Sequence, residues 1–233
     1  ERKNVFTTQA FKDGLFEVQD ASSQLVAPFL EVQPGQRVVD ACAGACGKTL
    51  HLAAQMENKG QIYAHDADRL RLAPIHERLK RSGVHNVQVR DPASSDLDDL
   101  KGHMDLVFVD APCTGTGVWR RRPDSKWRLS EKALADRIED QRRVLDAVKH
   151  FVKPGGRIAY VTCSLLCPEN DAQVDWFLEE NPEFESVSAE NEWKRLLPDV
   201  PVPAYSNARG DLTLTPATTA TDGFYFALIK RNG

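Results

Sequence analysis

Short apolar runs recur along the chain, and each ends at a polar residue or a turn. They lie at 36–40, 58–66, 86–91, 104–110 and 155–163. Runs such as "DLVFVD" are nearly continuously apolar, which is typical of strands buried on both faces of a parallel sheet. The pattern therefore predicts five buried strands.

Segments of helical composition alternate with these strands. They cover 48–56, 67–83, 130–153 and 168–182. Pro74 predicts a break in the second helix, and Ser130 is a candidate N-cap for the third. The alternation predicts an α/β fold with a mostly parallel central sheet and helices on both faces. In such sheets ligands bind at the carboxyl ends of the strands.

The C-terminal part of the chain has a different pattern. Residues 222–231 ("DGFYFALIKR") read as a closing strand. Residues 186–221 are rich in Pro, Thr and Asn and have no clear periodicity. We expect this segment to be a long ordered loop lying over the active site.

Length and composition bound the class of protein. The chain has 233 residues, of which 41% are hydrophobic, enough to bury the core of one large domain. It has no apolar run of about 18 residues, so no membrane span is expected. Its five cysteines are an odd number, which favours a reducing, cytoplasmic location over a disulfide framework.

The net charge of −4 does not by itself suggest a nucleic-acid partner, but the charge is unevenly distributed. Residues 119–143 contain nine Lys and Arg against five Asp and Glu, so they carry +4 and the remainder carries −8. Within this stretch "WRRRPDSKWR" combines cations with Trp119 and Trp127, a composition suited to phosphate contacts and base stacking. A solvated surface with buried tryptophans is the alternative.

The turn "DACAGACGKTL" ends in Gly47-Lys48-Thr49, like the tail of a phosphate-binding P-loop. A P-loop requires another glycine at position 42, where this chain has Cys42. That glycine allows the backbone to curl around phosphates, so its absence disfavours a nucleotide hydrolase.

The same turn suits a nucleoside cofactor. Small residues let the backbone approach a ligand, and Asp66 ends the next strand, where a carboxylate can accept both ribose hydroxyls. This arrangement fits NAD as well as S-adenosylmethionine. The alternative is that these aspartates only cap helices and turns.

Two cysteines follow strands at the expected active edge. Cys113 stands in "VDAPCTGTG" and Cys163 in "VTCSLL". Polar turns favour reactive thiols, whereas most single cysteines are buried and inert. Cys42/Cys46 and Cys163/Cys167 have a spacing compatible with zinc, but each pair spans a strand-to-helix turn with another explanation, so we expect no metal.

These motifs together carry a resemblance that covers nearly the whole chain. Asp-Ala-Pro-Cys and Thr-Cys-Ser resemble the Sun/Fmu family of S-adenosylmethionine-dependent RNA cytosine-5 methyltransferases. So do "GLFEVQDASSQLVAPFL", "DACAGACGKT", "RRRPDSKWR" and "TDGFYFALIKR".

The chain departs from the family pattern at two positions. The family turn carries two glycines before its lysine, and here Cys46 replaces the first. Arg122 replaces an asparagine. The resemblance implies the Rossmann-like fold of S-adenosylmethionine methyltransferases.

The resemblance also implies catalytic roles. A thiolate adds to carbon 6 of cytosine and activates carbon 5 toward a methyl group. Cys163 corresponds to this nucleophile, and Cys113 to the residue that resolves the adduct. DNA cytosine methyltransferases attack from a Pro-Cys turn, so Cys113 is the competing nucleophile. Asp110 is placed to quench charge near N3 or to contact the cofactor, and Lys48 to lie near the base or the cofactor.

The predicted cofactor contacts are the turn and four acidic strand ends: Cys42, Ala43, Gly44, Ala45, Cys46, Gly47, Lys48, Asp66, Asp91 and Asp110, with Asp40 as the strand end before the turn. The predicted RNA contacts are Arg120, Arg121, Arg122, Lys126 and Arg128.

The expected organisation is an N-terminal segment, 1–33, before a catalytic domain at 34–233. A further RNA-binding domain is expected outside this chain. We expect the protein to be a monomer. The expected partner is RNA, rRNA rather than tRNA. The alternatives are an inactive S-adenosylmethionine-binding protein and a dinucleotide-dependent oxidoreductase.

Overall fold

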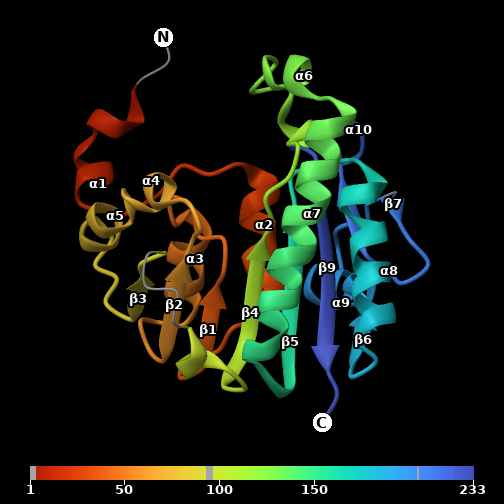
Figure 1. The fold of residues 1–233 in the computed structure, drawn as a ribbon. Helices are drawn as coiled ribbons and strands as arrows, with labels where there is room; N and C mark the ends of the chain where they lie inside the picture. The colour runs from red at the N-terminus through yellow and green to blue at the C-terminus, as the bar shows by residue number, and fades with distance from the viewer. Residues whose placement is uncertain (1–3, 93–96, 204) are drawn as a thin grey trace.

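The computed structural model describes residues 4–92, 97–203 and 205–233. A mixed sheet runs through these residues in the order β3-β2-β1-β4-β5-β9-β8-β7, and β6 also pairs with β9 (Figure 1). The strands are β1 Arg37–Asp40, β2 Gln61–His65, β3 Val87–Arg90, β4 Met104–Asp110, β5 Val152–Thr162, β6 Phe184–Val187, β7 Tyr205–Ser206, β8 Leu212–Leu214 and β9 Phe224–Arg231.

The five predicted strands form the parallel half of this sheet. β1 pairs with β2 on one side and with β4 on the other, so the strand order reverses beside β1. The register places Asp40 opposite Phe108 and Asp110 opposite Val161. The carboxyl ends of β1, β4 and β5 therefore meet at one edge, next to the reversal point where such folds bind ligands.

Helices cover both faces, as predicted (Figure 1). The α-helices are α1 Gln9–Lys12, α2 Ala21–Leu30, α3 Gly47–Gln55, α4 Arg69–Leu72, α5 Ile75–Arg81, α6 Ser125–Arg128, α7 Glu131–Val148, α8 Asp171–Glu180, α9 Ala189–Leu196 and α10 Pro216–Thr219. Within β1 the side chains alternate: Val38 packs in the core under α2, α3 and α9, and Val39 packs in the core under α7 and α8. This alternation explains why the strands read as continuously apolar.

Local signals set most helix boundaries. Ser130 accepts a hydrogen bond from the Ala133 amide and caps α7, as predicted. Pro74 separates α4 from α5, also as predicted. The predicted end of the third helix at 153 is wrong, because Val152 already pairs with Met104 in the sheet. Pro154 disfavours helix at the residue before it and so supports the earlier end.

The prediction of a loop at 186–221 is wrong. This segment contains β7, β8, α9, α10 and the end of β6. β8 and β6 both pair with β9 in antiparallel fashion, which extends the sheet beyond β5. The strands have only two to four residues, too few for a period to emerge from the sequence.

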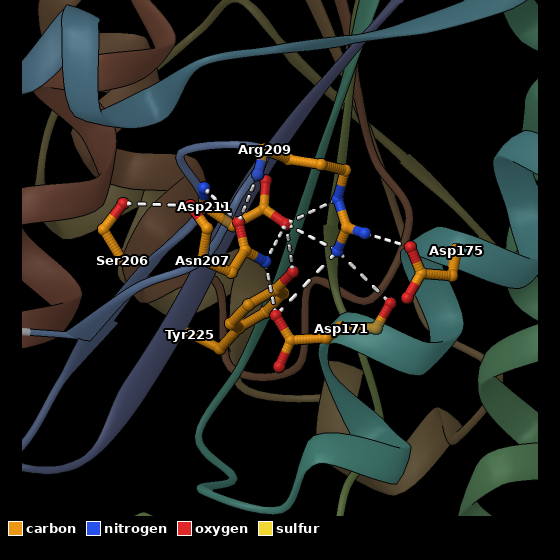
Figure 2. A network of polar contacts seen from close by, with 7 residues as sticks. All are labelled: Asp171, Asp175, Ser206, Asn207, Arg209, Asp211 and Tyr225. Carbon is orange, nitrogen blue, oxygen red and sulfur yellow. Dashed lines mark hydrogen bonds and ion pairs between the residues drawn. The ribbon is translucent and has the colours of Figure 1, made fainter.

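A buried polar network anchors the β7–β8 hairpin (Figure 2). Asp211, 1% exposed, accepts hydrogen bonds from the Tyr225 hydroxyl at 2.7 Å and the Asn207 amide at 2.8 Å. Arg209 forms an ion pair with Asp211 at 2.8 Å and also contacts Asp171 at the start of α8. The network therefore ties the hairpin to β9 and to α8.

The N-terminal segment contributes to the same core. Val26, Phe29 and Leu30 of α2 are buried against α3, α9 and β9, and Phe29 stacks on Trp193 with ring centroids 5.3 Å apart. Residues 21–30 therefore pack into the same core as the central sheet. Among the described residues, no helix is long and apolar enough to cross a membrane.

Candidate active site

The turn after β1 bends sharply because two residues adopt left-handed backbone conformations. Gly44 has φ +50° and Cys46 has φ +61°. Cys46 stands where the turn of the resembling family has glycine, and a non-glycine residue in this conformation costs about 1–2 kcal/mol. Its side chain is fully buried beside Leu50, Leu72 and Ile75, which offsets that cost.

The second strand end holds the turn in place. Asp66 accepts hydrogen bonds from the Gly44 amide at 2.9 Å and the Asp68 amide at 2.8 Å. It lines a cavity of about 450 Å³ together with Cys42, Arg71 and residues of α7. Each carboxylate oxygen still has a lone pair to offer a ligand hydroxyl, so the predicted role of Asp66 is compatible with its contacts.

A charged pair lies where β1 and β4 end. Lys48 Nζ is 2.6 Å from Asp110 Oδ2, and both side chains are largely screened from solvent. Burial alone would lower the pKa of Lys48, but the charge of Asp110 and its hydrogen bond outweigh burial and raise it. Lys48 is therefore an ammonium group held at the strand ends by Asp110. Its position is explained without a nucleotide phosphate as its partner.

Asp40 lies beside this pair. Its Oδ2 accepts a hydrogen bond from the Thr49 hydroxyl at 2.6 Å, whereas its buried Oδ1 has no side-chain partner among the residues that the structure describes. Burial raises the pKa of Asp40 to about 7, and the nearby Asp110 carboxylate adds to the effect. Asp40 also lines a hollow of about 160 Å³ along the turn. A buried polar atom without a partner calls for an explanation, and a polar ligand group in the adjoining hollow is one.

The two predicted catalytic cysteines face each other. Cys113 Sγ and Cys163 Sγ lie 3.3 Å apart, within hydrogen-bonding distance for sulfur. This hydrogen bond lowers the pKa of Cys163, although its burial and Asp110 act in the opposite direction. The same bond raises the pKa of Cys113 well above its usual value, and burial adds to the effect.

Cys163 is alone among the five cysteines in having a lowered pKa. Burial raises the pKa of Cys46 to about 12 and that of Cys42 well above its usual value, and the pKa of the exposed Cys167 is also raised. Because the thiolate is the reactive form, these directions favour Cys163 as the nucleophile and Cys113 as its hydrogen-bond donor.

Three hollows join along this edge through shared walls. Cys163, Lys48 and Asp110 line one of about 240 Å³. Lys48 and Asp110 also line the hollow along the turn, which shares Cys42 and Arg71 with the 450 Å³ cavity. The turn hollow therefore lies between the large cavity and the hollow beside Cys163, with lining residues in common with each.

Comparisons with known proteins agree with this geometry. Residues 27–230 match the family model described as 16S rRNA methyltransferase RsmB/F. The chain belongs to the RsmB/F family.

Relatives support the assignment. Ribosomal RNA small subunit methyltransferase B of Vibrio cholerae is 34% identical over 98% of this chain and 49% of its own length. NSun6 from Pyrococcus horikoshii, solved with SFG, is 26% identical with a TM-score of 0.82, over 100% of this chain and 57% of that one. A methyltransferase homolog from the same organism is 32% identical with a TM-score of 0.77, over 99% of this chain and 73% of that one. The predicted resemblance and fold class are thus confirmed, and the chain spans about half the length of the curated relatives it matches.

In this RsmB/F chain most of the predicted site residues come together. The hollow along the turn is lined by Asp110 and by all the turn residues from Cys42 to Lys48 except Cys46. The side chain of Cys46 is buried in the core. Asp91 instead lines a separate hollow of about 350 Å³ with Arg69 and His76, which shares no lining residue with the other three.

Among the described residues, no group of acidic, His and Cys side chains is arranged to hold a metal ion.

The basic stretch is only partly available to a partner. Arg120 and Arg121 form ion pairs with Asp222, which is 2% exposed, and Arg128 pairs with Asp124. Within the described ranges Arg122 and Lys126 form no ion pair. Trp127 is 83% exposed, and Lys126 Nζ lies 5.7 Å from the centre of its ring, so this tryptophan is a surface residue.

Sequence reasoning missed several residues that line the hollow beside Cys163. Asp20, Ser23, Asp222 and Phe224 all lie there. Their segments, "QDASSQ" and "TDGFY", entered the analysis only through the family resemblance. No local pattern shows that two segments separated by some two hundred residues meet at one hollow. The pairing of β9 with β5 places Asp222 and Phe224 there, and the packing of α2 against β9 brings Asp20 and Ser23 to them.

The titration of Asp40 gives a testable pH dependence. Its folded-state pKa lies above that of an unfolded aspartate, so its contribution to stability is lost as the pH rises from about 4 to about 7. Asp40→Asn retains an oxygen for Thr49 and removes the charge. Between about pH 5 and about pH 8, the wild type should lose about 2.6 kcal/mol more unfolding free energy than Asp40→Asn, as measured by urea titration. Parallel pH profiles would contradict the assignment.

Proposed function

We propose that this chain is the catalytic region of an S-adenosylmethionine-dependent methyltransferase that modifies carbon 5 of a cytosine in rRNA. One observation carries the proposal: two thiols lie 3.3 Å apart, and the one with the lowered pKa, Cys163, lines a hollow that shares Lys48 and Asp110 with the turn hollow. Family membership and the rRNA-modifying names of the relatives support the choice of rRNA over tRNA.

The cofactor would occupy the cavity beside the turn. Asp66 would accept its ribose hydroxyls, and the unpartnered Oδ1 of Asp40 and the turn backbone would face its polar groups. When bound, S-adenosylmethionine supplies an electrophilic methyl group. A dinucleotide would fit the same strand ends, but the family assignment supports S-adenosylmethionine.

The cytosine would enter the hollow beside Cys163. The Cys163 thiolate adds to carbon 6, and the electron pair of the C5–C6 double bond becomes available at carbon 5. Lys48, already charged through its pairing with Asp110, can donate a hydrogen bond to the ring as negative charge develops. After methyl transfer the Asp110 carboxylate, which lines the hollow, accepts the carbon 5 proton, and the electron pair of that C–H bond restores the C5–C6 double bond. The C6–sulfur bond then breaks, with Cys113 donating a hydrogen bond to the departing sulfur.

The base must leave its stack to reach Cys163. Arg121 and Arg122 line the hollow, and Arg122, Lys126 and Trp127 continue over the surface from it to α6. This surface suits a single-stranded or locally opened RNA, with Trp127 as a stacking platform. The choice of cytosine would also use the additional RNA-binding domain that we predict outside this chain.

Binding of S-adenosylhomocysteine tests the cofactor assignment. Calorimetry should detect binding to the wild type, and Asp66→Asn should weaken it by about 10- to 100-fold because a charge-assisted hydrogen bond is lost. A thermal melt should show that the variant is folded. Binding of NAD in place of S-adenosylhomocysteine would support the oxidoreductase instead.

The cysteines test the covalent mechanism. Cys163→Ala should neither methylate RNA nor form a covalent complex with it, because the nucleophile is missing. Cys113→Ala should still attack but release product slowly, so an adduct should accumulate on denaturing gels. An adduct with Cys163→Ala and none with Cys113→Ala would reverse the two roles, and an inactive S-adenosylmethionine-binding protein would give no adduct in any variant.

The basic surface is tested by salt dependence. Arg122→Ala combined with Lys126→Ala should weaken RNA binding and reduce the slope of log K against log salt by up to about one unit per lost contact. Lys230→Ala, at the opposite end of β9, should leave the slope unchanged. An unchanged slope in the double variant would mean that the stretch is only a solvated surface.

A further inference from the structure

A buried glutamate connects the two cysteine loops. Glu169 ends the short 3-10 helix Cys167–Glu169 and is 0% exposed. Its side chain lies between the loop after β4, which carries Cys113, and the loop after β5, which carries Cys163. None of the roles assigned to the reaction above uses this carboxylate.

Glu169 binds the residue that follows each cysteine. It accepts hydrogen bonds from the Thr114 amide at 2.8 Å and from the Thr114 hydroxyl at 2.5 Å. It also accepts one from the Ser164 hydroxyl at 2.5 Å. The Gln141 amide, which donates to Pro112 as well, contributes a fourth at 3.1 Å. One side chain therefore fixes the separation of the two loops.

Backbone contacts bring the loops together at a second point. The Gly117 amide donates to the Cys163 carbonyl at 2.9 Å, and the Leu165 amide donates to the Thr116 hydroxyl at 2.8 Å. A side chain at Gly117 would have its Cβ 2.7 Å from the Cys163 carbonyl oxygen. The loops are thus packed too closely to move independently.

The charge of Glu169 acts unequally on the two sulfurs. All four of its donors are neutral, and within the described residues no cation pairs with it. The pKa of Cys113 is raised by its hydrogen bond to Cys163, then by burial and the charges of Cys163 and Glu169. The lowered pKa of Cys163 has no contribution from Glu169 among its main causes.

We propose that Glu169 is a positioning residue that holds Cys113 as a protonated thiol within hydrogen-bonding reach of Cys163. This inference rests on the proposed covalent mechanism. With both loops fixed, the Cys113 thiol donates to the Cys163 sulfur and stabilises its negative charge before attack and again when the sulfur leaves. Other titratable groups facing the pair are Lys48 and Asp110 beside Cys163 and Tyr160 beside Cys113.

Glu169→Gln tests the proposal, with Asp211→Asn as its matched control. Asp211 is an equally buried carboxylate with several donors, which Figure 2 shows. Among the described residues none of these donors is on a cysteine loop. Thermal melts would establish that both variants are folded. Iodoacetamide labelling across a range of pH, with peptides identified by mass spectrometry, would then report the thiolate at each cysteine without any RNA.

In Glu169→Gln, Cys113 should be labelled about three- to tenfold faster at a given pH, because a negative charge that disfavours its thiolate is gone. Covalent RNA adduct should also accumulate, as expected for Cys113→Ala, because release is slowed. Asp211→Asn should change neither readout. A wild-type labelling profile in folded Glu169→Gln, or the same changes in Asp211→Asn, would overturn the proposal.

A second pair of variants applies if Glu169→Gln does not fold. Thr114→Val removes one donor to Glu169 and should accumulate adduct, whereas Thr114→Ser keeps the hydroxyl and should release product at the wild-type rate. Equal release rates for the two would overturn the positioning role. Absence of an adduct in Cys113→Ala itself would instead contradict the covalent mechanism, so the two failures are distinguishable.

Discussion

The parallel pairing of β4 with β1 on one side and β5 on the other is the constraint on which the site depends. Its register sets Asp40 opposite Phe108 and Asp110 opposite Val161. Because parallel strands end at the same edge, the acidic residues and both cysteine loops meet there, as their positions at the ends of the apolar runs predicted. The turn before α3 then brings Lys48 over this edge to reach Asp110.

The parallel half of the fold could be predicted because each strand is apolar on both faces and ends at a polar residue. Ser130 and Pro74 gave helix boundaries for the same local reason. In the antiparallel half, β9 was predicted from the apolar run at 222–231. β7 and β8 could not be predicted, because they are too short to show a period and are stabilised by their pairing with each other and with β9 and by the Asp211 network. Cys163 and Cys113 were identified from their motifs, but their separation is a tertiary property.

Buried carboxylates recur around the site and are compensated in different ways. Asp222 is paired with Arg120 and Arg121, and Asp211 with Arg209. Glu169 accepts hydrogen bonds from neutral groups, and Asp40 accepts one from the Thr49 hydroxyl. Removing a partner from a buried charge is costly, so Arg120 and Arg121 have a structural role that their composition alone, in a basic surface stretch, did not reveal.

Three successive residues at the start of α8 bind in three directions. Glu169 holds the cysteine loops, Asn170 accepts a hydrogen bond from Thr162 at the end of β5, and Asp171 contacts Asn207 and Arg209 of the hairpin region (Figure 2). Adding or deleting one residue here would rotate the following side chains by about 100° around a helix axis. The spacing from Cys163 to Asp171 is therefore fixed in length, and family members that keep this arrangement have to place insertions elsewhere in the chain.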